Sequence, residues 1–344
     1  MSRIKSILKI LLINGLFLLA LLYIFEFFFS PFSDMPKNGI MLTGEEYTWG
    51  HKVRRNQLGY RERDFTNPKP DDVFRVIVLG DSLTMGMGLA ESERYTHLTE
   101  KRLRKQFPER KIEILNFGMS GYPTVTERDD LLKHYEFVKP DLIVIGFCIN
   151  DTQPKEQNWS IEQDKYYHSF MGKLITVSKK VMRRLGLNYI AKLTHQLYYQ
   201  PLINVGKIPE WQTALQRTYE PESKEWQDFT QALQDIKNLS EKLQLPTPVF
   251  SVLNQGTYTD KPTYYSNPDK NLQQFLKWYE QAEHAAKKVG LNTYNHQQEI
   301  IEHVDDEILA VNKFDGHPSA SLNRIYSDKL ADVLTKIINT QSLR

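Results

Sequence analysis

The chain has 344 residues, enough for one large domain or two smaller ones. With 40% hydrophobic and 25% charged residues it has the composition of a globular protein, and its net charge of +2 gives no indication of nucleic-acid binding. Its single cysteine, Cys148, excludes an intrachain disulfide and a cysteine-based zinc site.

The N-terminal sequence predicts a membrane anchor. Residues 10–29 are almost wholly apolar and would span about 30 Å as a helix, enough to cross a bilayer. Three basic residues precede this run, so residues 1–9 are expected in the cytoplasm and the following domain outside it.

A cleaved signal peptide is the alternative to an anchor. Its apolar region is usually shorter, and no small-x-small cleavage site follows this one. We therefore predict an uncleaved transmembrane segment over residues 10–30. Glu26 is its one acidic residue, and near the outer interface its carboxylate would reach lipid headgroups.

Residues 31–71 predict a tether that merges into an irregular lead-in, because they are rich in proline, glycine and charge and show no sustained period. Within them, the turn-forming stretch from Asn56 to Arg61 is expected to pack on the following domain, residues 72–344.

From Val73 onward, short apolar runs alternate with amphipathic helical patterns. Several runs are nearly continuous, as expected of parallel strands covered on both faces. This alternation predicts an α/β fold, a three-layer α/β/α sandwich with a parallel sheet. The predicted strands are 73–79, 112–116, 142–149, 248–253 and 291–295, and the predicted helices are 92–106, 123–138, 225–243, 270–289 and 319–340.

A segment from about 152 to 222 interrupts this alternation and predicts a helical insertion. Residues 165–209 contain eight lysines and arginines but no aspartate or glutamate, and apolar residues from Leu174 to Leu185 fall at helical spacing. One interpretation is a basic cap that contacts anionic headgroups or an anionic glycan near the membrane. The other is a helical elaboration whose basic face is merely solvated.

The first predicted strand ends abruptly in Gly80-Asp81-Ser82, followed by small residues. A hydroxyl at the carboxyl end of a central parallel strand lies where open α/β sheets place their chemistry. Ser82 is therefore a candidate nucleophile, provided that a base and an anion-stabilising pocket lie nearby.

Candidates for the base and its orienting acid lie near the C-terminus. His317 falls in a predicted turn before the last helix, on the same sheet edge as Ser82. Asp315, two residues earlier, could hold the imidazole in the tautomer that accepts the serine proton. The other eight histidines lie in helical or irregular surroundings and are interpreted as structural or surface groups.

Two loops offer hydrogen-bond donors for an oxyanion. Gly118 follows the second strand, where a glycine lets a backbone N–H approach a ligand, and Asn150 ends the third strand with a side-chain amide. Each is alternatively an ordinary turn residue. Their order after successive strands favours the functional interpretation.

These segments resemble the four sequence blocks of the SGNH, or GDSL, hydrolase family. The blocks match in the family's order, from about residue 73 to residue 340. The resemblance implies a flavodoxin-like sheet and no cofactor or metal. It also implies Ser82 as nucleophile, His317 as base, Asp315 as orienting acid, and an oxyanion hole made by the N–H groups of Ser82 and Gly118 with the Asn150 amide. The matching blocks are Gly80-Asp81-Ser82-Leu83-Thr84, Asn116-Phe117-Gly118-Met119-Ser120-Gly121, Asn150-Asp151 and Asp315-Gly316-His317-Pro318.

Two blocks depart from the family's usual pattern. The third usually reads Gly-x-Asn-Asp, whereas Cys148 stands here at the glycine position, which would crowd the strand end and shift Asn150. The fourth often reads Asp-x-x-His, whereas Asp315 precedes His317 by only two residues.

We therefore expect an anchored, exported serine hydrolase, on the periplasmic side of an inner membrane, that cleaves an acyl ester on an envelope glycan or lipid through a Ser82 acyl-enzyme. If a sugar hydroxyl intercepts that intermediate, the same residues make an O-acyltransferase. A catalytically inactive binding module is a further alternative, against which the intact motif residues argue. We expect no nucleic-acid partner, and protein partners stay open.

Overall fold

The computed structural model describes residues 2–29, 37–154, 165–254, 270–303, 308–312 and 315–341. Its contacts divide the chain into two units, Met1–Val53 with Ser160–Glu210 and Arg54–Trp159 with Trp211–Arg344. Each unit has a sheet of its own.

The larger unit contains a five-stranded sheet in the order β5-β4-β6-β7-β8, with all neighbours parallel. This is the flavodoxin-like order, and it confirms the predicted parallel α/β fold. The central strands are long, buried apolar runs because helices cover both of their faces. The strands are β4 (Val73–Gly80), β5 (Lys111–Gly118), β6 (Leu142–Phe147), β7 (Val249–Val252) and β8 (Asn292–Asn295).

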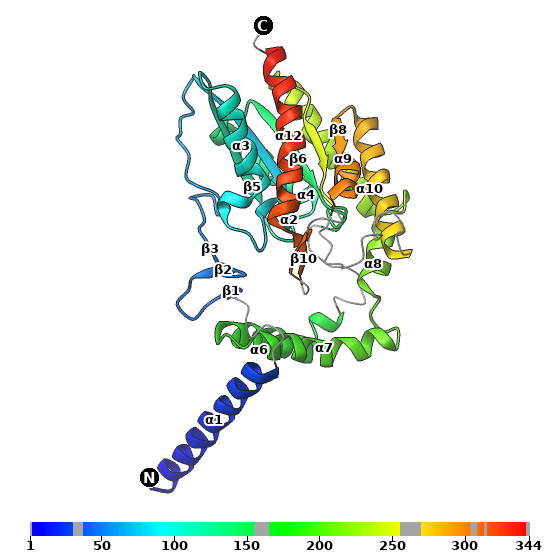
Figure 1. Ribbon diagram of the computed structural model, residues 1–344. Coiled ribbons are helices and arrows are strands. Elements are labelled where there is room, and N and C mark those ends of the chain that lie inside the picture. Colours follow the sequence, from blue (N-terminus) through cyan, green and yellow to red (C-terminus); the bar gives the residue numbers. More distant parts are fainter. Residues whose placement is uncertain are drawn as a thin grey trace. The chain divides into compact units, whose positions relative to one another are not determined.

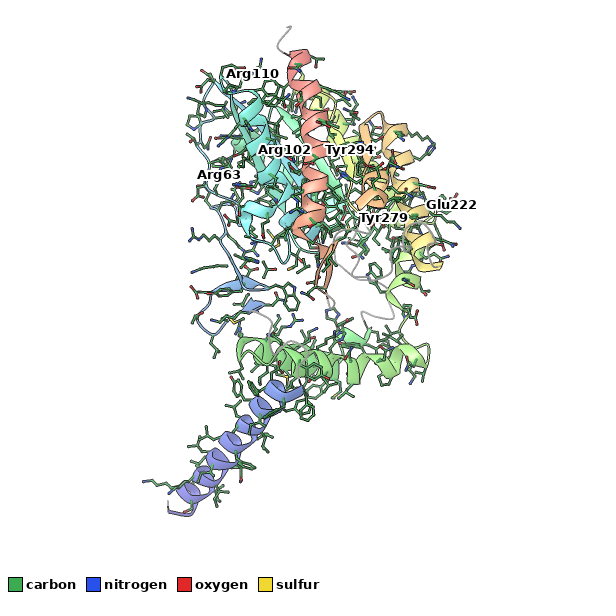
Figure 2. The ribbon with its side chains drawn as sticks, viewed as in Figure 1. Arg63, Arg102, Arg110, Glu222, Tyr279 and Tyr294 are labelled. Atoms are coloured by element: carbon green, nitrogen blue, oxygen red, sulfur yellow. The ribbon has the colours of Figure 1, made fainter. Side chains whose placement is uncertain are left out.

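Helices lie on both sides of this sheet (Figure 1). Helices α3 and α12 pack against each other on one face, and α4, α9 and α10 pack together on the other. Arg102 of α3 points toward α12, where its guanidinium forms an ion pair with Asp328 (Figure 2). The helices are α3 (Tyr95–Gln106), α4 (Thr124–Val138), α9 (Lys224–Lys242), α10 (Lys270–Val289) and α12 (Ala320–Gln341).

Five shorter elements complete the larger unit. Strands β9 and β10 form a separate antiparallel pair. The elements are η1 (Glu91–Glu93), α8 (Trp211–Thr218), α11 (Gln297–His303), β9 (Ala310–Asn312) and β10 (Asp315–Pro318).

A row of three glycines crosses the carboxyl ends of the central strands, since Gly80 pairs with Gly118 on one side and Gly146 on the other. The short helix α2 (Ser82–Met85) lies directly against this row. A Cβ atom on Gly118 would lie 2.2 Å from the backbone nitrogen of Met85, and one on Gly146 would lie 2.5 Å from Thr84 Oγ1. Only residues without side chains let α2 approach this closely.

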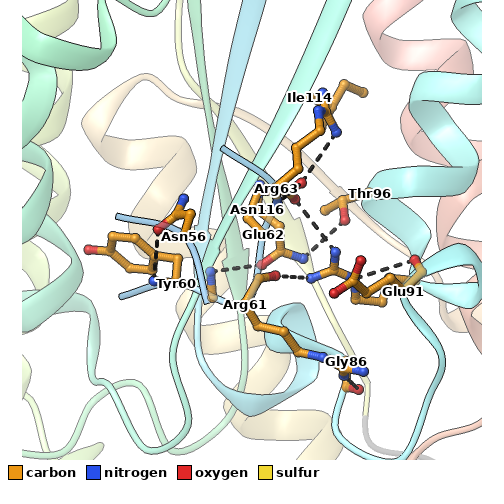
Figure 3. Close-up of polar contacts among 12 residues, drawn as sticks. Asn56, Tyr60, Arg61, Glu62, Arg63, Gly86, Glu91, Thr96, Ile114 and Asn116 are labelled. Carbon is orange, nitrogen blue, oxygen red and sulfur yellow. Dashed lines mark hydrogen bonds and ion pairs between the residues drawn. The ribbon is translucent and has the colours of Figure 1, made fainter. Parts of the chain in front are cut away.

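The lead-in segment from Asn56 packs against the larger unit, as its sequence predicts. Tyr60 and Arg61 are almost wholly buried. The Arg61 guanidinium donates to the carbonyl oxygen of Gly86 at 2.6 Å, just beyond the C-terminus of α2 (Figure 3). It also donates to the carbonyl oxygen of Leu89 at 2.6 Å. The segment thereby fixes the chain that follows Ser82.

The smaller unit consists of the N-terminal helix, a three-stranded antiparallel sheet and a helical pair. Among the described residues, α1 is the one helix long and apolar enough to cross a membrane, and none of its apolar window is buried. A signal sequence would satisfy the same criterion. The elements are α1 (Ser2–Phe29), β1 (Gly39–Ile40), β2 (Glu46–Thr48), β3 (His51–Val53), α6 (Phe170–Arg184) and α7 (Asn188–Asn204).

Glu26 of α1 has a protein partner in this unit. Its carboxylate accepts hydrogen bonds from the backbone N–H groups of Tyr189 and Ile190, at 2.7 and 3.0 Å. These belong to the first turn of α7, whose N–H groups have no partners within the helix and carry a partial positive charge. The acidic side chain of the apolar segment therefore lies at the N-terminus of α7.

Replacing Arg61 with methionine should lower the free energy of unfolding by about 2–6 kcal/mol, because two buried carbonyl groups lose their donor at about 1–3 kcal/mol each. Chemical denaturation of the full chain in detergent measures this change. The same substitution at exposed Arg54 is the control and should stay within about 0.5 kcal/mol of the native chain. Equal effects at the two positions would contradict the role assigned to Arg61.

Candidate active site

Ser82 is the first residue of α2, immediately after β4, and it is 8% exposed. Asp81 caps the helix, since its Oδ1 accepts a hydrogen bond of 2.8 Å from the Leu83 N–H. Aspartate is a preferred residue at this position because its side chain satisfies an N–H group that lacks a helical partner. The strand and the cap together hold the hydroxyl at the sheet edge.

The structure brings His317 and Asp315 to Ser82. His317 Nε2 lies 2.9 Å from Ser82 Oγ, although 235 residues separate the two. On its other side, Nδ1 hydrogen-bonds to Asp315 Oδ1, and the same oxygen accepts from the His317 backbone N–H at 3.1 Å. The two-residue spacing thus places the Asp315 carboxylate within hydrogen-bond distance of the His317 imidazole.

The turn predicted around His317 is wrong in detail. Asp315–Pro318 forms strand β10, which pairs with β9 through an irregular register. The composition of this motif, with its aspartate, glycine and proline, favours a turn. The segment is instead a strand because it pairs with β9, whose residues lie outside the motif.

The contacts of His317 define which atom can accept a proton. With Nδ1–H donating to Asp315, the lone pair on Nε2 faces the Ser82 hydroxyl. Burial lowers the pKa of His317, but the hydrogen bond and charge of Asp315, with the charge of Asp81, outweigh it and raise that pKa above 6.5. Asp315 therefore favours the protonated form of the His317 imidazole.

Asn150 reaches the same site from the end of β6. Its Nδ2 donates to Asp81 Oδ2 at 3.1 Å. The turn that carries it is closed by Asp151, whose Oδ2 accepts from the Cys148 N–H at 2.9 Å. With Cys148 at the usual glycine position, Asn150 still contacts Asp81, the residue before Ser82.

Gly118 has another partner. Its N–H donates to Asn116 Oδ1 at 2.9 Å, and the Asn116 Nδ2 donates to the carbonyl oxygen of Thr84 at 2.6 Å. Asn116 thus links the end of β5 to α2. A Gly118 N–H in an oxyanion hole would have to share or break its present hydrogen bond.

Asp81 is the residue that the sequence analysis missed. It is fully buried, and its Oδ2 contacts both Asn150 Nδ2 and, at 3.3 Å, Ser82 Oγ. Burial raises its pKa, while hydrogen bonds from Leu83 and Asn150 oppose that rise. An aspartate directly before a short helix is an N-cap signal, but the contact with Asn150 depends on the fold.

No cluster of three or more histidine, cysteine, aspartate or glutamate side chains in the described part of the chain is arranged to hold a metal ion. The contacts of Ser82 allow its proton to pass to His317, close to the side-chain amide of Asn150.

Residues 78–325 match the model of the GDSL-like lipase/acylhydrolase family. No curated protein matches the chain. Among solved structures it is similar to Axe2, an acetylxylan esterase from Geobacillus stearothermophilus, at 15% identity and a TM-score of 0.40, over 74% of this chain and 91% of that one. It is also similar to TesA, at 14% identity and a TM-score of 0.41, over 76% and 97% of the two chains.

A further similarity is to the acetyl xylan esterase AlAXEase, at 13% identity and a TM-score of 0.42, over 76% of this chain and 99% of that one. The family match covers well over half of the chain and includes the segments after β4, β5 and β6 and the Asp315–His317 segment. The resemblance found in the sequence is therefore confirmed: this protein is an esterase of the GDSL-like lipase/acylhydrolase family, also called SGNH hydrolases.

Proposed function

We propose that the protein cleaves an acyl ester through a covalent intermediate on Ser82. The observation that carries this proposal is the unbroken series of contacts from Asp315 through His317 to the Ser82 hydroxyl. A serine is a weak nucleophile unless an adjacent base takes its proton as it attacks. The imidazole is already within hydrogen-bond distance of that proton.

In the proposed reaction, Ser82 Oγ attacks the carbonyl carbon of the ester while its proton passes to His317 Nε2. The carbonyl oxygen becomes an oxyanion in the tetrahedral intermediate. When this collapses, the bond to the alcohol oxygen breaks and His317 returns the proton to that oxygen. Water then attacks the acyl carbonyl carbon while its proton passes to the same imidazole. The bond to Ser82 Oγ breaks, the acid leaves, and His317 returns the proton to Ser82 Oγ.

The Asn150 amide and the Ser82 N–H are the proposed oxyanion donors. The Asn150 nitrogen carries two hydrogens, and the bond to Asp81 uses one of them. Asp81 thereby orients the amide before substrate arrives, which is what makes such a donor effective. The Gly118 N–H would join this pair only by sharing its bond with Asn116.

We propose further that α1 anchors the protein with its N-terminus in the cytoplasm, so that the esterase acts on a glycan or lipid of the cell envelope. The apolar length of α1 and the basic residues before it support this topology.

Release of free acid from an activated acetyl ester tests hydrolysis. If an added polysaccharide acceptor takes up the acetyl group at the expense of free acid, the protein is an O-acyltransferase.

Ser82→Ala and His317→Ala should each lower kcat by roughly 10⁴–10⁶-fold with folding intact, because nucleophile and base act as one unit. A fluorophosphonate probe should label the native chain and not Ser82→Ala. The control is Ser321→Ala on helix α12, which should label like the native chain. Absence of labelling in the folded native chain would leave an inactive binding module as the better account.

Asp315→Asn should lower kcat by about 10⁴-fold, because an amide favours the wrong imidazole tautomer. The pH profile gives a second readout. Activity needs neutral His317, so kcat/KM of the native chain should rise with pH through a midpoint above 6.5. Without the Asp315 charge, this midpoint should move to lower pH. An unchanged midpoint and a loss below tenfold would mean that another group orients His317.

Asn150→Ala should cost about 2.7–4 kcal/mol of transition-state stabilisation, or 10²–10³-fold in kcat, if its amide donates to the oxyanion. Steady-state kinetics on a small acetyl ester measure this loss, and KM should change little because the charge forms only in the transition state. A fall in kcat/KM that comes wholly from a higher KM would assign Asn150 to substrate binding instead.

A further inference from the structure

Helix α6 carries an apolar stripe that is open to solvent. Its members are spaced four, three and four residues apart, so they lie on one side of a helix with 3.6 residues per turn. Each is between 49% and 81% exposed, whereas Met182, which contacts Thr194 of α7, is half-buried. Such a contiguous apolar patch indicates an interaction surface. The stripe consists of Phe170, Leu174, Val177 and Val181.

Exposed basic side chains run beside this stripe. Lys173, Lys180 and Arg184 are spaced seven and four residues apart, which places them along one flank of it. No aspartate or glutamate occurs between residues 165 and 209 to offset their charge. We call the stripe and these three residues the α6 surface. An apolar face bordered by lysine and arginine is typical of helices that lie in a membrane interface.

The end of α6 is fixed to the last turns of α1. The Tyr23 hydroxyl donates to the carbonyl oxygen of Leu185 at 2.7 Å. Three residues further along α1, the Glu26 carboxylate accepts from the Tyr189 and Ile190 N–H groups. The junction between α6 and α7 is therefore attached to α1 at two successive levels.

The positions of Tyr23 and Glu26 along α1, measured from its last residue Phe29, match the depth at which interfacial helices lie. At 1.5 Å per residue, Tyr23 and Glu26 lie about 9 and 5 Å below Phe29 along the axis of α1. The apolar faces of interfacial helices are buried by about 5–10 Å at the headgroup boundary. A bilayer that surrounds α1 would thus reach the junction of α6 and α7, at the end of the helix that carries the stripe.

We propose that a bilayer surface with anionic headgroups covers the α6 surface, so that α1, α6 and the start of α7 enter the membrane as one unit. The proposal rests on the anchoring by α1 proposed above. The stripe would contact acyl chains, and Lys173, Lys180 and Arg184 would contact lipid phosphates. Glu26 joins the two parts by capping α7 from within the anchor.

The test measures depth in the full chain, reconstituted in vesicles of phosphatidylcholine and phosphatidylglycerol. A fluorophore is attached at Val177→Cys on the stripe, at Arg183→Cys on exposed α6 outside it, or at Leu18→Cys in α1. Cys148 is buried and burial raises the pKa of its thiol, so the native chain should take up little label. Nitroxide-bearing lipids should quench the labels at 177 and 18 and leave the label at 183 largely unquenched.

A second comparison tests the charge. Nitroxide phosphatidylglycerol should quench the label at 177 more strongly than nitroxide phosphatidylcholine at low salt, because basic side chains near the surface attract anionic lipid. Replacing Lys173, Lys180 and Arg184 with glutamine should abolish this preference. Glu26→Ala should reduce quenching at 177 and leave quenching at 18 unchanged, because it releases α7 from the anchor.

Quenching at 18 without quenching at 177 would overturn this inference and leave the anchoring intact. Absence of quenching at both positions would overturn the anchoring as well. If unlabelled Val177→Cys copies form a disulfide on addition of a mild oxidant, and the labelled chain shows no lipid quenching at 177, the stripe would be assigned to a second copy of the chain. Equal quenching by both nitroxide lipids would overturn the preference for anionic headgroups.

Discussion

The close approach of α2 to the ends of three parallel strands is the constraint on which the site depends. Gly80, Gly118 and Gly146 lie side by side in the sheet, and the atoms of α2 occupy the space where their Cβ atoms would be. A methyl group on Gly118 would meet backbone, which has no alternative rotamer. The glycines therefore set how deeply Ser82 lies at the sheet edge, and with it the distance to His317.

Hydrogen bonds from buried polar groups then hold α2 in the position that the glycines make possible. Asp81 caps α2 and also holds Asn150, so a single carboxylate orients both the nucleophile helix and an amide donor. From β5, Asn116 reaches the carbonyl oxygen of Thr84, and Arg61 holds the chain beyond α2. A site supported in this way is organised before substrate binds, which is how electrostatic stabilisation in an esterase becomes effective.

Much of the fold followed from the sequence because strands that are buried on both faces must be continuous apolar runs. The closeness of Ser82 and Asn150 could be predicted as well, since parallel strands bring their carboxyl ends to one edge, whereas His317 reaches that edge on β10 of a separate antiparallel pair and was predicted from its motif. The partners of Asp81 and Glu26 could not, because no sequence pattern links Asp81 to Asn150 or Glu26 to the start of α7. The spacing at Gly118 favoured an oxyanion donor, but its surroundings show a packing constraint that composition alone does not reveal.

The account's central claim is that Ser82 becomes acylated. The most direct measurement is rapid acid quenching of the full chain during turnover of a slow acetyl ester, followed by peptide mapping by mass spectrometry. We expect an acetyl group on the peptide that contains Ser82, appearing before steady state and absent from Ser82→Ala. Turnover with no acetylated peptide, or with the acetyl group on another residue, would contradict the account.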